Sequence, residues 1–226
     1  MFRAVIFDFD GVITDSEVLH LRSFNKILER FDLQISSRDY YRNYLGLSDF
    51  DLFTLLIEKN IIKVSKGSIG DLIKQKNVIF EELMENDGKI IGGVREFLDT
   101  LRNKAITMAI CSGALSAEIE LILEQANLRS YFEFIVAADH VGRGKPSPEG
   151  YLLAIEKLGF GKLPGLIGSE CIAIEDSHWG LEAAKAAGMH TIAVTNSYDA
   201  DQLTTAEMVV SDLREIKIKD IEMLCS

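Results

Sequence analysis

Two aspartates, Asp8 and Asp10, stand two residues apart where a short apolar run ends. The run from Phe2 to Phe7 predicts a buried strand that ends in a loop at Asp8. Two carboxylates this close repel each other and resist desolvation, and a bound cation or a proton held on one of them relieves both costs. The pair could therefore supply a nucleophile and a proton donor, although an acidic turn that only caps a strand has the same local pattern.

Three later apolar runs are also followed by polar residues suited to such a site. Ser112 and Gly113 offer a small hydroxyl and free amides near a helix start, which suit an oxyanion such as phosphate. Lys145, between a glycine and a proline, could neutralise a carboxylate and a phosphoryl group. Glu175 and Asp176 could divide metal binding and orientation of a neighbour between them. A turn, a solvated loop lysine and a charged helix N-cap are the respective structural alternatives.

The remaining sequence predicts the elements that hold these residues. From 15 to 88 the apolar residues recur at helical spacing, which predicts an all-helical unit. After a flexible return at 87–93, apolar strands alternate with helices, the pattern of a parallel α/β sheet. The predicted helices span about 17–31, 37–44, 48–60, 69–86, 94–103, 116–126, 148–158 and 179–187. The predicted strands span about 2–7, 107–111, 134–137, 171–174, 191–194 and 208–210.

Three glycines in this half of the chain have positional meaning. Gly159 and Gly188 stand where glycines that terminate helices are expected. Gly180 lies inside a predicted helix, which suggests that another group approaches the backbone closely there.

Composition and charge exclude several classes of protein. The 226 residues, 47% of them hydrophobic, suffice for a large core with a small second domain. The formal net charge of −11 disfavours nucleic acid or an anionic membrane as a partner, because phosphate backbones are bound by basic surfaces. No run approaches the roughly 18 apolar residues of a membrane span, and the N-terminus lacks the features of a signal peptide. We therefore expect a cytoplasmic protein. Its expected oligomeric state is a monomer. Cys111, Cys171 and Cys225 are odd in number and widely spaced, which indicates reduced thiols.

The four polar clusters, in this order and each after a predicted strand, resemble the motifs of the haloacid dehalogenase superfamily of phosphotransferases. The motifs are Asp8-Phe9-Asp10-Gly11-Val12, Cys111-Ser112-Gly113, Gly144-Lys145-Pro146 and Ile174-Glu175-Asp176-Ser177-His178-Trp179-Gly180. The resemblance covers the whole chain. It implies a doubly wound, Rossmann-like parallel sheet as the core, formed by 1–14 and 89–226, with 15–88 inserted as a helical cap. The pattern is most similar to β-phosphoglucomutase and the small sugar-phosphate and phosphoglycolate phosphatases.

The resemblance also implies a role for each motif residue. Asp8 would attack phosphorus to form an aspartyl phosphate. Asp10 would protonate the leaving alcohol and then, as a carboxylate, activate water. Ser112 and the amide of Gly113 would hold phosphate oxygens, while Lys145 would offset charge. The residues expected to bind the phosphate are Gly11, Ser112, Gly113 and Lys145.

A magnesium site follows from the same resemblance. Mg²⁺ would bind the Asp8 side chain, the Asp10 carbonyl and Asp176, with Glu175 close by. Hard oxygen ligands suit Mg²⁺ better than zinc, and the sequence contains no competing histidine and cysteine cluster. The metal has a physical purpose, because an anionic nucleophile must approach an anionic ester.

Substrate selection is expected to involve the cap. His20, the loop Gly46-Leu47-Ser48 and Lys76 resemble cap residues that face substrate in the mutase branch. A helix-packing histidine and a solvated lysine are the alternatives for His20 and Lys76. The expected ligand is a small phosphorylated metabolite, most simply a sugar phosphate.

Hydrolysis and phosphosugar mutation are the two activities that the motifs allow. A mutase must hold a bisphosphate and needs a second cationic site. In the mutase pattern an arginine follows the cap loop, whereas here Asp49 does, and 112–117 contains no basic residue. We therefore expect a Mg²⁺-dependent phosphoric monoester hydrolase, with a β-phosphoglucomutase-type enzyme as the alternative. A dehalogenase of the superfamily would lack an aspartate at Asp10, and a non-catalytic binding module would not fill every catalytic position.

Overall fold

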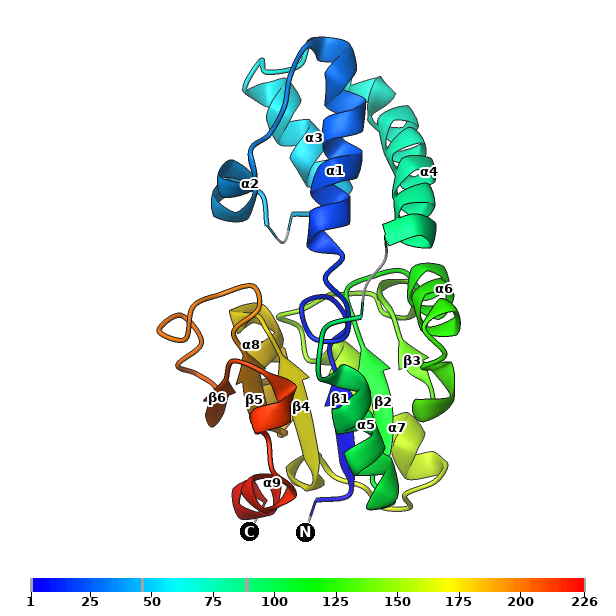
Figure 1. Cartoon of the computed structure of the whole chain (residues 1–226), viewed down its shortest axis with the longest axis vertical. Helices are drawn as coiled ribbons and strands as arrows, with labels where there is room; N and C mark the ends of the chain where they lie inside the picture. The colour runs from blue at the N-terminus through cyan, green and yellow to red at the C-terminus, as the bar shows by residue number, and fades with distance from the viewer. Residues whose placement is uncertain (1, 46, 88–89, 226) are drawn as a thin grey trace. The chain divides into compact units, whose positions relative to one another are not determined.

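The computed structural model of the chain describes residues 2–45, 47–87 and 90–225. The chain divides into two compact units, one formed by Met1–Asp15 and Ile90–Ser226 and the other by Ser16–Lys89. We call them the sheet unit and the helical unit (Figure 1). Gly46 of the predicted cap loop, and Gly88 and Lys89 of the predicted return, lie outside the described residues.

A six-stranded parallel sheet forms the centre of the sheet unit, with strand order β3-β2-β1-β4-β5-β6. Its strands are β1 (Ala4–Phe7), β2 (Thr107–Cys111), β3 (Ile135–Val136), β4 (Cys171–Glu175), β5 (His190–Val194) and β6 (Met208–Val210). The chain runs outward from β1 in both directions, so the strand order reverses there. Ligands of doubly wound sheets bind beyond the carboxyl ends of the strands at such a reversal. The predicted fold class is confirmed, and each predicted strand is present.

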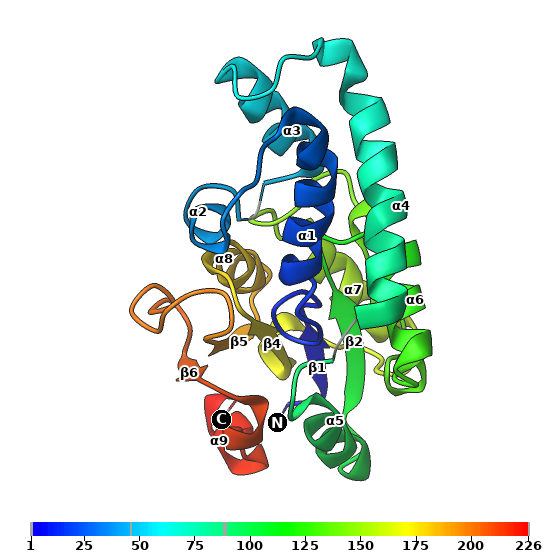
Figure 2. The same cartoon turned by 45° about the horizontal axis from the view of Figure 1, so that its top comes forward.

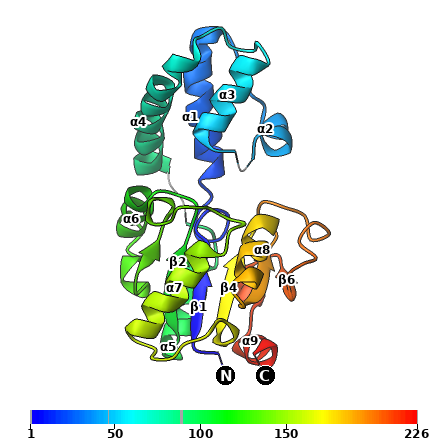
Figure 3. The same cartoon turned by 180° about the vertical axis from the view of Figure 1, so that it is seen from behind.

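Helices cover both faces of this sheet. They are α5 (Val94–Asn103), α6 (Ser116–Gln125), α7 (Glu149–Phe160), α8 (His178–Ala186) and α9 (Ile218–Leu224). Ala4 and Ile6 of β1 share one buried cluster with Tyr151 of α7. Phe7 has the opposite parity along the strand, and its ring meets that of Phe97 in α5 edge to face at 6.1 Å between centroids. Figure 1 shows α5 in front of the sheet, and Figure 3 shows α7 and α8 across its other face.

The helical unit packs its helices around an apolar core of its own. They are α1 (Glu17–Leu28), α2 (Ser37–Asn43), α3 (Asp49–Glu58) and α4 (Ile69–Asp87). Phe24, Ile27 and Phe53 are among its buried residues, and α1 packs along α4 (Figure 2). Ser36 and Ser48 cap α2 and α3, since each hydroxyl accepts from the amide three residues on. All helices predicted for this unit are present.

The structure also corrects details of the prediction. Gly188 follows α8 with a φ of +76°, as a helix-terminating glycine should, but Gly159 lies within α7, which continues to Phe160. The first helix ends at Leu28 and continues only as a 3₁₀ turn. The prediction missed α9, which is only seven residues long and buries only Ile221, although Ile218, Ile221 and Leu224 recur at helical spacing. The 3₁₀ turns span Glu29–Phe31, Lys66–Ser68, Arg129–Tyr131, Ala138–His140, Gly168–Glu170 and Leu213–Glu215.

The state of the cysteines and the character of the helices were also considered in the sequence. All three cysteines carry free thiols, and Cys111 and Cys171 are buried. Among helices of the described part of the chain, none has both the length and the apolar character needed to cross a membrane.

Candidate active site

Strand register brings the first and fourth motifs to one level at the carboxyl edge of the sheet. Phe7 pairs with Ile110 of β2 on one side and with Ile174 of β4 on the other. Asp8 therefore lies level with the end of both neighbours, and its amide donates to the Ile174 carbonyl at 2.9 Å. Its side chain thus faces a neighbourhood built from three strand ends that are far apart in sequence.

Lys145 links two carboxylates at this edge. Its Nζ lies 2.8 Å from Asp8 Oδ1 and 2.6 Å from Glu175 Oε1, and it also donates to the Cys111 carbonyl at 3.0 Å. Burial alone would lower the pKa of Lys145, but the carboxylates of Asp8 and Glu175 outweigh it and raise that pKa above its usual value. Lys145 is therefore a charged group of the site, and the alternative of a solvated loop lysine is wrong.

Glu175 is fully buried and held from several sides. Its Oε1 also accepts from the Tyr151 hydroxyl at 2.6 Å, and its Oε2 accepts from the Ser177 hydroxyl at 3.3 Å. Burial, followed by the charge of Asp8, raises the pKa of Glu175 to about 7. A Cβ at Gly180 would overlap the Glu175 carboxylate, which confirms the close approach predicted for that glycine.

The helix that follows is capped by Ser177, not by the acids before it. The Ser177 hydroxyl accepts from the Gly180 amide at 3.2 Å. The alternative in which Glu175 and Asp176 serve as a charged N-cap is therefore wrong.

Asp8, Glu175 and Asp176 form a buried acid cluster, in which one ligand oxygen from each lies within 4.8 Å of the others. Burial, followed by the charges of Asp8 and Glu175, raises the pKa of Asp176 well above its usual value. Three carboxylates face the one ammonium group of Lys145, so the cluster has excess negative charge when ionised. Hard oxygen donors with such an excess fit a divalent cation of the magnesium type. Asp10 is not in this cluster, and the ligand expected from it is its backbone carbonyl.

The phosphate-binding motif lies beside β2. Ser112 is buried, and its hydroxyl oxygen accepts from the Ala114 amide at 3.0 Å, which leaves the hydroxyl proton available to donate. A Cβ at Gly113 would meet no atom within 4 Å, so this backbone is open to approach. The expectation of a free amide is wrong for Ser112, because its amide donates to the Val136 carbonyl at 2.9 Å. The amide of Ser116 at the helix start is also occupied, since it donates to Asp139.

Position 11 requires glycine for two reasons, its backbone conformation and the atoms packed around it. Its φ is +74°, and a Cβ there would overlap Asp176 Oδ2 and approach the Ser197 hydroxyl to 2.8 Å. The turn that carries Asp10 is thus packed directly against the acid cluster.

Three residues of this neighbourhood escaped the sequence analysis, namely Tyr151, Asn196 and Ser197. Asn196 donates to the Gly11 carbonyl at 2.7 Å, and the Ser197 hydroxyl donates to Asp176 Oδ2. Both follow β5, so the rule of polar residues at strand ends could have found them. Tyr151 lies on an apolar helix face and gave no such signal.

Loss of the Tyr151 hydroxyl should be costly, because it would leave the buried Glu175 with one donor fewer. We expect Tyr151→Phe to lower the free energy of unfolding by about 2 kcal/mol, the range for hydrogen bonds to charged groups. Urea unfolding followed by circular dichroism measures this change. Tyr131→Phe is the matched control, because that hydroxyl donates to the exposed Asp99, and a change of less than about 0.5 kcal/mol is expected. Equal changes in the two variants would contradict the prediction.

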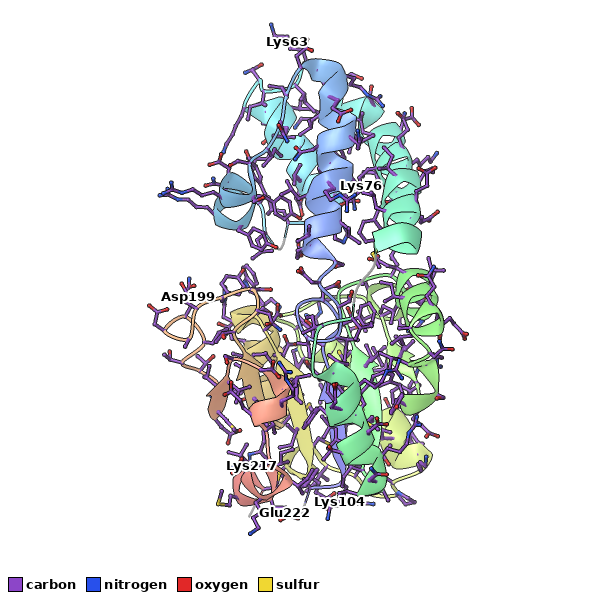
Figure 4. The ribbon with its side chains drawn as sticks, viewed as in Figure 1. Lys63, Lys76, Lys104, Asp199, Lys217 and Glu222 are labelled. Atoms are coloured by element: carbon purple, nitrogen blue, oxygen red, sulfur yellow. The ribbon has the colours of Figure 1, made fainter. Side chains whose placement is uncertain are left out.

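His20 and Lys76 lie together inside the helical unit. Lys76 Nζ is 2.6 Å from His20 Nδ1 and 3.2 Å from Asp49 Oδ1, and it lies over the rings of Phe24 and Phe80. Figure 4 shows Lys76 between α1 and α4. Lys76 is only 1% exposed, so the alternative of a solvated lysine is wrong. Burial, followed by the charge of Lys76, lowers the pKa of His20 well below its usual value.

Comparisons with known proteins agree with this arrangement. A family model described as haloacid dehalogenase-like hydrolase matches residues 5–194. The chain is 32% identical to a phosphorylated carbohydrates phosphatase of Thermotoga maritima, over 84% of this chain and 83% of that protein. It is 27% identical to a fructose-1-phosphate phosphatase of Escherichia coli, over 85% and 96% of the two chains. The crystal structure of a β-phosphoglucomutase from Clostridium difficile superposes with a TM-score of 0.81 at 25% identity, over 100% and 97% of the two chains.

Proposed function

Because this chain belongs to the haloacid dehalogenase-like hydrolase family, we propose that it hydrolyses the phosphate monoester of a small carbohydrate. The family resemblance and the expectation of an enzyme are confirmed by the match over residues 5–194. The observation that carries the proposal is the contact of Lys145 with Asp8 beside a buried acid cluster. Such a site offers a carboxylate nucleophile, charge neutralisation and cation ligands together.

The proposed reaction has two steps. In the first, Asp8 attacks phosphorus, the bond between phosphorus and the ester oxygen breaks, and Asp10 gives its proton to the leaving alcohol. In the second, Asp10 removes a proton from water while the water oxygen attacks the phosphorus of the aspartyl phosphate. The bond to Asp8 breaks, and inorganic phosphate is released.

The remaining site residues handle the negative charge of the phosphoryl group. Lys145 neutralises charge that Asp8 would otherwise present to the incoming ester. The Ser112 hydroxyl and the open backbone at Gly113 are suited to donate to phosphate oxygens. Asp8, Asp176 and the Asp10 carbonyl would hold Mg²⁺, with Glu175 near it. When bound, the ion would offset the repulsion between nucleophile and ester.

Hydrolysis is favoured over mutation by the residues found at two positions where the mutase pattern has basic side chains, one in each unit. A mutase needs an available cationic group for the second phosphate of a bisphosphate. Asp49 pairs with Lys76, and the segment 112–117 has no basic residue. The similar phosphatases named above support the same choice, whereas the similar mutase structure keeps a phosphosugar mutase as the second candidate.

The two units have separate roles in this proposal. The sheet unit carries the chemistry, and the helical unit acts as the cap. His20, which is only partly buried, contacts the carbohydrate, and the buried Lys76 acts on the carbohydrate through its contact with His20. We propose a monomeric cytoplasmic enzyme whose partner is this small phosphorylated metabolite, with no role for nucleic acid.

A product assay tests hydrolysis against mutation. The protein is incubated with Mg²⁺ and a panel of sugar monophosphates, and inorganic phosphate is measured. A parallel reaction with β-glucose 1-phosphate and catalytic glucose 1,6-bisphosphate follows phosphate and glucose 6-phosphate separately. We expect phosphate from at least one monophosphate, a loss of about a hundredfold or more with a chelator, and recovery with Mg²⁺. Glucose 6-phosphate forming faster than phosphate would establish the mutase, and no phosphate from any ester would overturn the phosphatase.

A further inference from the structure

The turn after β5 contacts the loop that carries Asp10 and Gly11 and the loop that carries Asp176. It does so through two consecutive residues, Asn196 and Ser197. β4 and β5 are parallel neighbours, and Glu175 pairs with Ala193. Asp176, one residue on, is therefore level with Val194 at the end of β5. The residues that follow Val194 thus emerge at the same edge of the sheet as Asp176, which explains how they reach it.

Each of the two residues donates to a different loop. The Ser197 hydroxyl donates to Asp176 Oδ2, and Asn196 Nδ2 donates to the Gly11 carbonyl at 2.7 Å. Gly11 directly follows Asp10, so the turn is tied to the first motif and to the fourth. A serine whose own turn is anchored by its neighbour can hold a carboxylate in one orientation.

The packing around Ser197 leaves little freedom for that orientation. A Cβ at Gly11 would overlap Asp176 Oδ2 and approach Ser197 Oγ to 2.8 Å, so these three groups are in close contact. Asp176 is 5% exposed, and one of its two oxygens is occupied by the Ser197 hydroxyl. Rotation of the buried carboxylate would break its bond to the part-buried Ser197 hydroxyl, and a charged oxygen that loses a hydrogen-bond donor in a buried position is costly.

We propose that Ser197 is a positioning residue for metal binding, which fixes the Asp176 carboxylate as a ligand while Asn196 anchors its turn to Gly11. The inference rests on the proposed function, because it assumes that the acid cluster binds Mg²⁺. Groups that hydrogen-bond to a metal ligand set its orientation, and their removal weakens metal affinity by about 10–100-fold.

Direct measurement of metal binding tests this role without relying on activity. The Mg²⁺ dissociation constant of the full chain is measured by isothermal titration calorimetry, and Mn²⁺ binding by electron paramagnetic resonance. We expect Ser197→Ala to weaken both by about 10–100-fold, and Ser197→Thr, which keeps a hydroxyl, to remain within about threefold of the unaltered chain.

Two comparisons separate positioning from simple support of the turn. Ser211→Ala is the matched control, because that hydroxyl also follows a strand and donates to the carboxylate of Glu215, away from the acid cluster. Its Mg²⁺ affinity should be unchanged. Valine has the shape of threonine but lacks the hydroxyl group. A difference in Mg²⁺ affinity between Ser197→Val and Ser197→Thr therefore measures the effect of the hydroxyl alone.

The possible failures are distinguishable. If the unaltered chain binds Mg²⁺ and Ser197→Ala and Ser197→Val bind it within twofold, the positioning role is overturned while the proposed function stands. If the unaltered chain binds no divalent cation and releases no phosphate, the proposed function itself has failed.

Discussion

Asp8→Asn is expected to abolish phosphate release while the sheet unit stays folded. An amide has the shape of the carboxylate but is a poor nucleophile and a weaker metal ligand, so the rate should fall by at least about a thousandfold. Stability should change little, because Lys145 keeps its ion pair with Glu175 and one of three mutually repelling carboxylates becomes neutral. Initial rates of phosphate release and the circular dichroism melting curve measure the two quantities.

Asp212→Asn provides the matched control for this substitution. Asp212 pairs with Arg214 at the surface of the same unit, and its loss should leave the rate within about twofold, as for other surface changes. Radiolabelled phosphate from the substrate should be recovered on the quenched, unaltered protein and not on Asp8→Asn. An Asp8→Asn protein with more than a few per cent of normal activity, or one that still carries label, would remove Asp8 from its role.

The residues that meet at the carboxyl edge of the sheet could be predicted because a simple rule relates their positions in the sequence to their positions in the fold. Polar residues directly after apolar strands meet at one edge when the strands are parallel and adjacent. Asp8 directly follows β1, Ser112 directly follows β2, and Glu175 is the last residue of β4. These three strands are neighbours in the sheet. The same rule, applied to β5, would have added Ser197.

Side-chain contacts that depend on how a helix packs against another element could not be predicted in this way. Nothing in the local sequence of Tyr151 distinguishes a core tyrosine from one that donates to a buried glutamate, since the partner comes from 24 positions away. Lys76 follows Lys74 and Gln75, a pattern typical of a solvated helix face, yet its ammonium group is enclosed by His20 and Asp49. Both cases depend on how helices pack, which the periodicity of one helix does not specify.

Gly180→Ala is expected to destabilise the protein although it places alanine in a helix. The substitution would gain up to about 1 kcal/mol of helix propensity. Its Cβ, however, would overlap the carboxylate of Glu175, which must move away from Lys145 and Tyr151. Disrupting a buried, hydrogen-bonded charge pair costs about 3–5 kcal/mol, so the net loss should be about 2–4 kcal/mol. Urea unfolding of the full chain measures this change.

Gly159→Ala separates this steric effect from helix propensity. Gly159 also lies within a helix, but a Cβ there would meet Leu166 at no closer than 3.8 Å, an ordinary contact. It should therefore leave stability unchanged or raise it by up to about 1 kcal/mol. Phosphate release should fall with Gly180→Ala and not with Gly159→Ala, because only the first displaces a partner of Lys145. A Gly180→Ala protein as stable as the Gly159→Ala protein would show that Glu175 can yield at little cost, and the tight packing of that carboxylate would then not be essential to the site.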